Sequence, residues 1–144
     1  MIHKFSNIEP NIPLFSEYIG TEKWINYGKD NLYPDFLIDI MNKSAINKTC
    51  ITSKQDAIFG QGLFTQDPED VSKLENANPK ESWNDIFYKI AFDYVVFGGY
   101  ALNVIWGKTG EFISEVYHVD FSKLRSGHIN PETQRVDFYY YSLS

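Results

Sequence analysis

The stretch that decides the fold runs from residue 82 to residue 106 and reads SWNDIFYKIAFDYVVFGGYALNVIW. Ser82 and Asp85 have the spacing that resembles a capping box, in which the two side chains satisfy N–H groups at the start of a helix. The apolar face of this helix is expected to consist of Trp83, Ile86, Phe87, Ile90, Ala91, Tyr94 and Val95. After Gly98-Gly99 the helical period is lost and strand-forming residues begin. The stretch therefore predicts a main helix followed directly by a strand.

The chain after residue 106 alternates turn residues with short runs of strand formers. Gly107-Lys108-Thr109-Gly110 is typical of a hairpin turn, and Asn130-Pro131 marks another turn. The expected strands cover residues 100–106, 112–119, a weaker stretch from about 124, and 136–141. Together they predict an antiparallel meander of about four short strands.

Two further main helices are expected upstream. Pro34 suits the first turn of a helix over residues 34–43, because its missing N–H is not needed there. Ser44 is a favourable N-cap for a second helix that ends near Phe59. The inner stripe of the second helix is expected to consist of Ile46, Cys50, Ser53, Ala57 and either Ile58 or Phe59. A helix of one or two turns is expected over residues 67–74.

The N-terminal segment lacks a clear period. It contains Pro10 and Pro13, which favour extended backbone, and it is still rich in aromatic residues. We expect an extended arm over residues 1–33, packed on its own domain or on a neighbour, and a second unit over residues 34–144. The expected fold class is α+β, with the arm and about three main helices followed by the β-meander.

Composition narrows the classes of function. The 144 residues carry 13 Lys plus Arg against 19 Asp plus Glu, a net charge of −6. A dedicated nucleic-acid binder normally shows a basic stripe, so DNA near this protein would be tolerated and not gripped. The single cysteine excludes a disulfide within the chain, and no apolar stretch is long enough for a membrane span. We therefore expect a protein of a reducing cytoplasm that is neither secreted nor embedded.

The search for chemistry finds no complete site. His118 is either a general base aligned by Asp120 or a strand residue near a turn, and no nucleophile is placed beside it. Cys50 is expected to be a small buried residue in the middle of a helix. His3 and His128 complete the histidines, and no pair of them has metal-ligand spacing. We expect no catalytic, cofactor-binding or metal-binding residue, and hence no enzyme.

Four segments carry a family resemblance, and they are Tyr27–Pro34 (YGKDNLYP), Ile58–Leu63 (IFGQGL), Asp93–Leu102 (DYVVFGGYAL) and Glu115–Arg125 (EVYHVDFSKLR). The first contains a G-x-D-N-L-Y-P motif, the third is a helix that ends in aromatic-glycine before a strand, and the fourth ends in a D-x-S-K-x-R turn. In this order, from about Trp24 to Arg125, the segments resemble the N-terminal part of portal proteins from tailed phages and prophages of the Bacteroides group.

The resemblance implies a structural role in the virion. Portal subunits form a homo-oligomeric ring, typically a dodecamer, at one capsid vertex. The ring nucleates capsid assembly, docks the terminase, passes double-stranded DNA without sequence recognition and joins head-tail adaptor proteins. Residues 34–144 would then form a wing-like domain of an incomplete portal chain, found in the virion and, during assembly, in the bacterial host cytoplasm. The resemblance assigns no DNA-contacting residue here.

Two other classes of function stay open. Aromatic residues make up 17% of the chain, which suits a non-enzymatic adaptor whose aromatic-rich sheet binds a protein partner. A small hydrolase or transferase is the third possibility, and a loss of turnover in a His118→Ala variant would support it.

Overall fold

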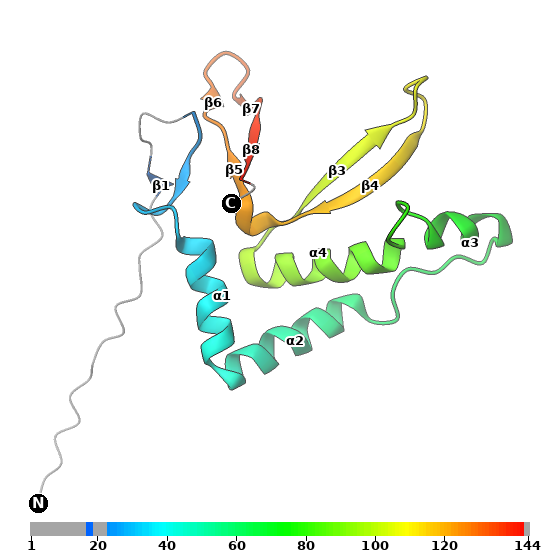
Figure 1. The fold of residues 1–144 in the computed structure, drawn as a ribbon, viewed down its shortest axis with the longest axis horizontal. Helices are drawn as coiled ribbons and strands as arrows, with labels where there is room; N and C mark the ends of the chain where they lie inside the picture. Colours follow the sequence, from blue (N-terminus) through cyan, green and yellow to red (C-terminus); the bar gives the residue numbers. More distant parts are fainter. Residues whose placement is uncertain (1–16, 19–22, 143–144) are drawn as a thin grey trace, which may run out of the picture.

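The computed structural model describes residues 17–18 and 23–142, and it confirms an α+β fold (Figure 1). The helices in these residues are α1 (Tyr33–Lys43), α2 (Ala45–Phe59), α3 (Pro68–Glu75) and α4 (Trp83–Phe97). The strands are β1 (Glu17–Tyr18), β2 (Asn26–Tyr27), β3 (Ala101–Trp106), β4 (Ile113–Val119), β5 (Leu124–Ser126), β6 (Ile129–Asn130), β7 (Arg135–Val136) and β8 (Tyr139–Tyr141). No described helix has the length and apolar character that a membrane span needs.

The helix boundaries follow the capping residues of the sequence. The Ser82–Asp85 capping box is present at the start of α4, and the Ser44 hydroxyl accepts the N–H of Asn47 at 3.2 Å at the start of α2. The Asp67 carboxylate accepts the N–H of Glu69 at 2.9 Å and caps α3. Each side chain satisfies an N–H group that has no partner within its helix, which fixes where the helix begins.

Helix α4 lies between the β3–β4 hairpin on one side and α2 on the other (Figure 1). Its hairpin side holds the core, where the fully buried Ile86 packs with Ala77 and Val116. Its other side contacts α2 through the ring of Phe59, whose centroid lies 5.7 Å from that of Phe87. The expected apolar face is correct for Ile86 and Ala91 but wrong for Tyr94, which is 56% exposed.

The expected inner stripe of α2 is wrong except for Phe59, one of the two alternatives for its last position, which packs on α4. Ile46 is 80% exposed, and Cys50, Ser53, Ala57 and Ile58 are exposed as well. The face that packs consists of Asn47, Ile51, Gln55 and Phe59, each four residues from the next. Gln55 is buried because its side-chain amide donates to the backbone carbonyl of Tyr88 on α4 at 3.0 Å. A hydrogen bond of this kind removes the cost of burying the amide, so a polar residue occupies the centre of the contact.

The strands pair as separate two-stranded ladders and do not form one continuous meander. Strands β3 and β4 pair antiparallel from Ala101–Val119 to Trp106–Ile113, with an irregularity at Ile105/Trp106. Strand β5 pairs with β8, and β6 pairs with β7, so this part of the chain forms a second hairpin. A 3-10 turn, η1 (Phe121–Lys123), separates the two hairpins and redirects the chain (Figure 1).

Part of the expected arm packs on its own chain. The N–H of Ile25 donates to the carbonyl of Ser126 at 2.9 Å, and Trp24 forms a bridge with Gly127. The Trp24 ring lies 5.6 Å from the Tyr140 ring. The segment that enters α1 is therefore attached to the C-terminal hairpin, while residues 1–16 and 19–22 of the expected arm lie outside the described residues.

Candidate functional site

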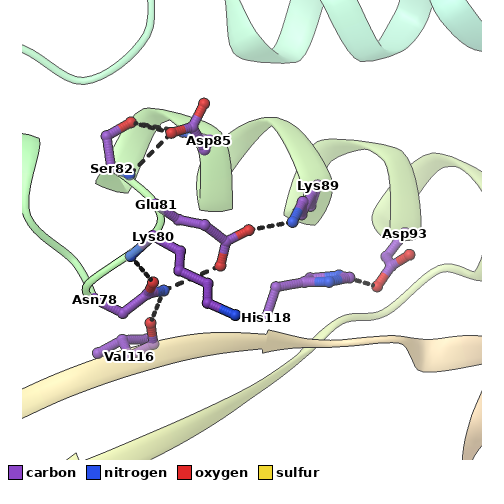
Figure 2. Close-up of polar contacts among 9 residues, drawn as sticks. All are labelled: Asn78, Lys80, Glu81, Ser82, Asp85, Lys89, Asp93, Val116 and His118. Atoms are coloured by element: carbon purple, nitrogen blue, oxygen red, sulfur yellow. Dashed lines mark hydrogen bonds and ion pairs between the residues drawn. The ribbon is translucent and has the colours of Figure 1, made fainter.

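A polar cluster fills the junction between α4, the turn before it and strand β4 (Figure 2). The side-chain amide of Asn78 donates to the Val116 carbonyl at 2.9 Å and to the Glu81 carboxylate at 3.0 Å. The Glu81 carboxylate, just before α4, also forms an ion pair with Lys89 of α4. Hydrogen bonds from Lys89, and secondly from Asn78, hold the pKa of the Glu81 carboxyl below its usual value. The cluster fastens the turn to the middle of β4 and so sets the distance between helix and hairpin.

The carboxylate partner of His118 is Asp93 of α4, and not Asp120 as one reading of the sequence expects. The Nε2 atom of His118 lies 2.7 Å from Oδ2 of Asp93, and the two side chains are 14% and 4% exposed (Figure 2). The Asp120 carboxylate instead accepts the N–H of Ser122 at 3.0 Å and caps η1. Asp93 points at the hairpin because it lies on the same side of α4 as Ile86 and Ile90.

The His118–Asp93 pair has one part of a hydrolytic site. A carboxylate that orients an imidazole can support a general base, but acyl transfer also needs a nucleophile within hydrogen-bond reach and donors for the oxyanion. The described contacts of His118 give it the Asp93 carboxylate and no hydroxyl or thiol. Within the described ranges, no group of three His, Cys, Asp or Glu side chains could hold a metal ion. We interpret the pair as a structural contact that holds β4 against α4.

Cys50 lies on the surface, which overturns its expected burial. It lines an open groove together with Leu37, Ile40, Asn47, Ile51, Lys54, Val95 and Val96. The thiol stands in the middle of α2, away from the helix N-terminus that would favour a reactive thiolate.

Arg125 joins two of the segments on which the family resemblance rests. Its Nε atom donates to the Asn31 side chain at 2.5 Å and its Nη2 atom to the Asn31 carbonyl at 3.1 Å. Its Nη1 atom donates to the carbonyls of Ser122 and Leu124 at 2.6 and 2.8 Å. The guanidinium also stands over the Tyr27 ring, 4.8 Å from the centroid. The G-x-D-N-L-Y-P and D-x-S-K-x-R motifs thus form one structural unit, which we call the Asn31–Arg125 clasp.

Asn31 can take part in the clasp because of its backbone conformation. Its φ of 61° lies in the left-handed region, which Asn tolerates better than most residues. Its side-chain oxygen also accepts the N–H of Tyr27 at 3.2 Å, which closes the turn that leads into α1. Burial lowers the pKa of the Arg125 guanidinium, and interactions with Tyr27 and Asp35 act in the opposite direction.

A cavity of about 310 Å³ opens beside the clasp. We call it the C-terminal cavity, and it is lined by Trp24, Asn31, Lys123, Arg125, Tyr140, Tyr141 and Ser142. These lining residues supply two cations and three aromatic rings and no carboxylate. Such a lining suits a group that combines an apolar ring with a negative charge.

Large apolar side chains lie on the surface of several elements. Phe64, in the loop between α2 and α3, is 81% exposed, and Trp106 and Phe112 near the tip of the β3–β4 hairpin are each 58% exposed. The hairpin tip projects past α4 at the end of the molecule where α3 lies (Figure 1). Exposed apolar residues that gather on ordered elements are typical of contacts with other proteins.

No protein-family model matches the chain, and neither a curated protein nor a solved structure is significantly similar to it.

The contacts of three residues could not be predicted from the sequence. Asp93 looks like a solvent-facing helix residue, and the one signal for it is that it follows Ile86 by seven positions and so shares its face. Asn78 lies in an Asn-Ala-Asn-Pro turn that reads as a helix breaker. Arg125 is part of a motif, but nothing in its neighbourhood points to Asn31, which is 94 residues away.

Proposed function

We propose that this chain is a structural assembly protein, the N-terminal part of a portal subunit of a tailed phage. The observation that carries the proposal is the Asn31–Arg125 clasp. Two segments that resemble portal motifs contact each other, because Arg125 of the second donates to the side chain and the backbone carbonyl of Asn31 in the first, 94 residues away in sequence. A resemblance to two portal motifs is more specific when residues of the two motifs also contact each other in the fold.

The surface properties support an assembly role. Eighteen large apolar or aromatic side chains are exposed in the described part of the chain, among them Phe64, Trp106 and Phe112. A surface of this kind is normally covered by partners. The acidic charge of −6 suits a protein that lets DNA pass without gripping it. On this proposal the partners are other portal subunits, the terminase, the capsid protein and head-tail adaptors.

An adaptor that binds an unrelated protein through the β3–β4 hairpin is the second candidate. The observation in its favour is the apolar tip of the hairpin, where Trp106, Phe112 and Ile113 are exposed. This candidate requires no ring and no phage particle, so it predicts no association of the chain with virions.

Labelling of phage particles tests the proposal. An antibody raised against this chain should bind purified virions at a single vertex, and gold labelling should place it where the tail joins the head. Labelling that is absent from virions, or spread evenly over all vertices, would refute the portal assignment. A His118→Ala variant addresses catalysis separately, since we expect it to change stability and no turnover.

A further inference from the structure

An acidic segment with an exposed phenylalanine leads into α3, and the cationic, aromatic C-terminal cavity is lined by residues of β5, β8 and the segment before α1. Figure 1 shows α3 well separated from β5 and β8. We call residues 63–70 (LFTQDPED), which are the segment before α3 and the first turn of α3, the Phe64 loop. We propose that the Phe64 loop of one copy of this chain docks in the C-terminal cavity of the next copy. The inference rests on the proposed assembly function and names a contact for it.

The Phe64 loop is held in place while its ring is presented to solvent. The side chain of Asn84 on α4 accepts the N–H of Leu63 at 2.7 Å and donates to the Leu63 carbonyl at 3.3 Å. Gly62 has a φ of +78°, and a Cβ atom there would lie 2.6 Å from Oδ1 of Asn84. Phe64 follows this anchor and is 81% exposed. An aromatic ring on a fixed loop loses little conformational freedom on binding, which favours association.

The charge of the loop complements that of the cavity. Asp67, Glu69 and Asp70 give the loop three carboxylates. Asp70 pairs with Lys73 at 2.5 Å, and Asp67 caps α3, whereas the Glu69 side chain extends into solvent. Around the cavity, Lys123 is half-buried and adds its ammonium group to the buried guanidinium of Arg125.

The shape of the cavity suits an aromatic ring with a nearby carboxylate. Its volume of about 310 Å³ is at the lower limit of ordinary binding cavities, enough for one or two side chains. Trp24 and Tyr140 form an aromatic wall, with ring centroids 5.6 Å apart, and Tyr141 is 47% exposed at the rim. The Phe64 ring would pack against this wall while Glu69 approaches Lys123.

The placement of the two surfaces decides the kind of assembly. The loop and the cavity are different surfaces, and the elements that carry them, α3 and the β5–β8 pair, lie apart, so each copy offers one of each to its neighbours. A head-to-tail contact of this type repeats from copy to copy and closes into a ring when the rotation allows it. A contact built from one ring and one charge pair is small, and we expect a dissociation constant on the order of 100 µM.

Sedimentation over a range of concentrations tests the contact. The wild-type chain should grow in mass from about 1 µM to about 1 mM and exceed the mass of a dimer. Phe64→Ser and Lys123→Glu should each weaken association by about tenfold, the effect of about 1.4 kcal/mol. An equimolar mixture of the two variants should form dimers and stop there, because each mixed pair keeps one intact loop and one intact cavity. Exchange of charges in a Glu69→Lys, Lys123→Glu double variant should restore association relative to Lys123→Glu alone.

Ile46→Ser is the matched control, because Ile46 is 80% exposed on α2, away from both surfaces. It should associate like the wild type. A wild-type chain that stays monomeric to about 1 mM would overturn the contact, and so would association that Phe64→Ser and Lys123→Glu leave unchanged. Neither result bears on the portal proposal, which the labelling of virions tests separately, so a failure of the contact can be told apart from a failure of the portal proposal. Circular dichroism of each variant shows whether it folds, and Tyr141→Ser, at a half-exposed rim position, replaces Lys123→Glu if that variant does not.

Discussion

Removal of the His118 imidazole should leave the Asp93 carboxylate buried without its partner. The Asp93 side chain is 4% exposed and lies 2.7 Å from His118, so water cannot readily replace the lost interaction. A buried hydrogen-bonding group that is left without its partner typically costs about 1–3 kcal/mol. Against a total stability of about 5–15 kcal/mol, His118→Ala should stay folded but lose a large part of its free energy of unfolding. Asp93→Ala should also cost about 1–3 kcal/mol, because the His118 ring nitrogen then loses its partner.

The assay is a double-mutant cycle measured by urea denaturation. If the two residues act as a pair, the double variant should be more stable than the sum of the single losses predicts, by about 1–3 kcal/mol. A second cycle that combines His118→Ala with Asp120→Ala is the control, since the Asp120 carboxylate accepts the N–H of Ser122 and caps η1. That cycle should be additive within about 0.5 kcal/mol. A coupling near zero between residues 93 and 118, or a coupling as large with Asp120, would refute the assignment of the pair.

Four further changes test other parts of the structure. Asn78→Ala should lower the free energy of unfolding by about 1–3 kcal/mol in urea, because the buried carbonyl of Val116 loses its donor. Glu81→Gln should flatten the acid side of the curve of stability against pH. The pKa of Glu81 in the folded protein lies below its usual 4.5, so the carboxylate stabilises the fold above pH 4.5, and this stabilisation is lost as the pH falls through the folded pKa. Thermal denaturation at a series of pH values measures the difference. Gly98→Ala should cost about 1 kcal/mol in thermal denaturation through its φ of +77° alone, since an added Cβ meets nothing within 4 Å. Cys50 should react with a thiol reagent in the folded protein nearly as fast as in urea, and strong protection would contradict its exposed position.

Local signals in the sequence were sufficient to predict where the helices begin. Ser44, Asp67 and Ser82 each cap a helix as expected, because a cap depends on residues within one turn of it. The hairpin over residues 101–119 was predictable for the same reason, since its turn and both strands are adjacent in sequence.

The packing face of α2 could not be predicted from apolar spacing. The stripe from Ile46 to Ala57 has helical spacing, and so does the stripe from Ile51 to Phe59 that packs. The second stripe is centred on Gln55, whose burial depends on a carbonyl 33 residues away on α4. A pattern that scores a buried glutamine as polar therefore selects the wrong face.

The candidate site shows the same dependence on distance along the chain. His118 was recognised, but its partner Asp93 is 25 residues away, and the nearer Asp120 is engaged in a cap. Arg125 and Asn31 are 94 residues apart, and both were seen as motif residues without their contact. His118 and Asp93 meet because α4 packs on the β3–β4 hairpin. Arg125 and Asn31 meet because the C-terminal hairpin packs on the segment before α1.

The Asn31–Arg125 clasp also orders events during folding. Closing a loop of 94 residues in an unfolded chain costs about 4 kcal/mol in entropy by the logarithmic rule, more than a few hydrogen bonds return. The clasp therefore forms late, after α2, α4 and the first hairpin have shortened the effective loop between its ends. On the ribosome, the contact cannot form before Arg125 has emerged, so until then Asn31 lacks the partner that links the segment before α1 to the C-terminal hairpin.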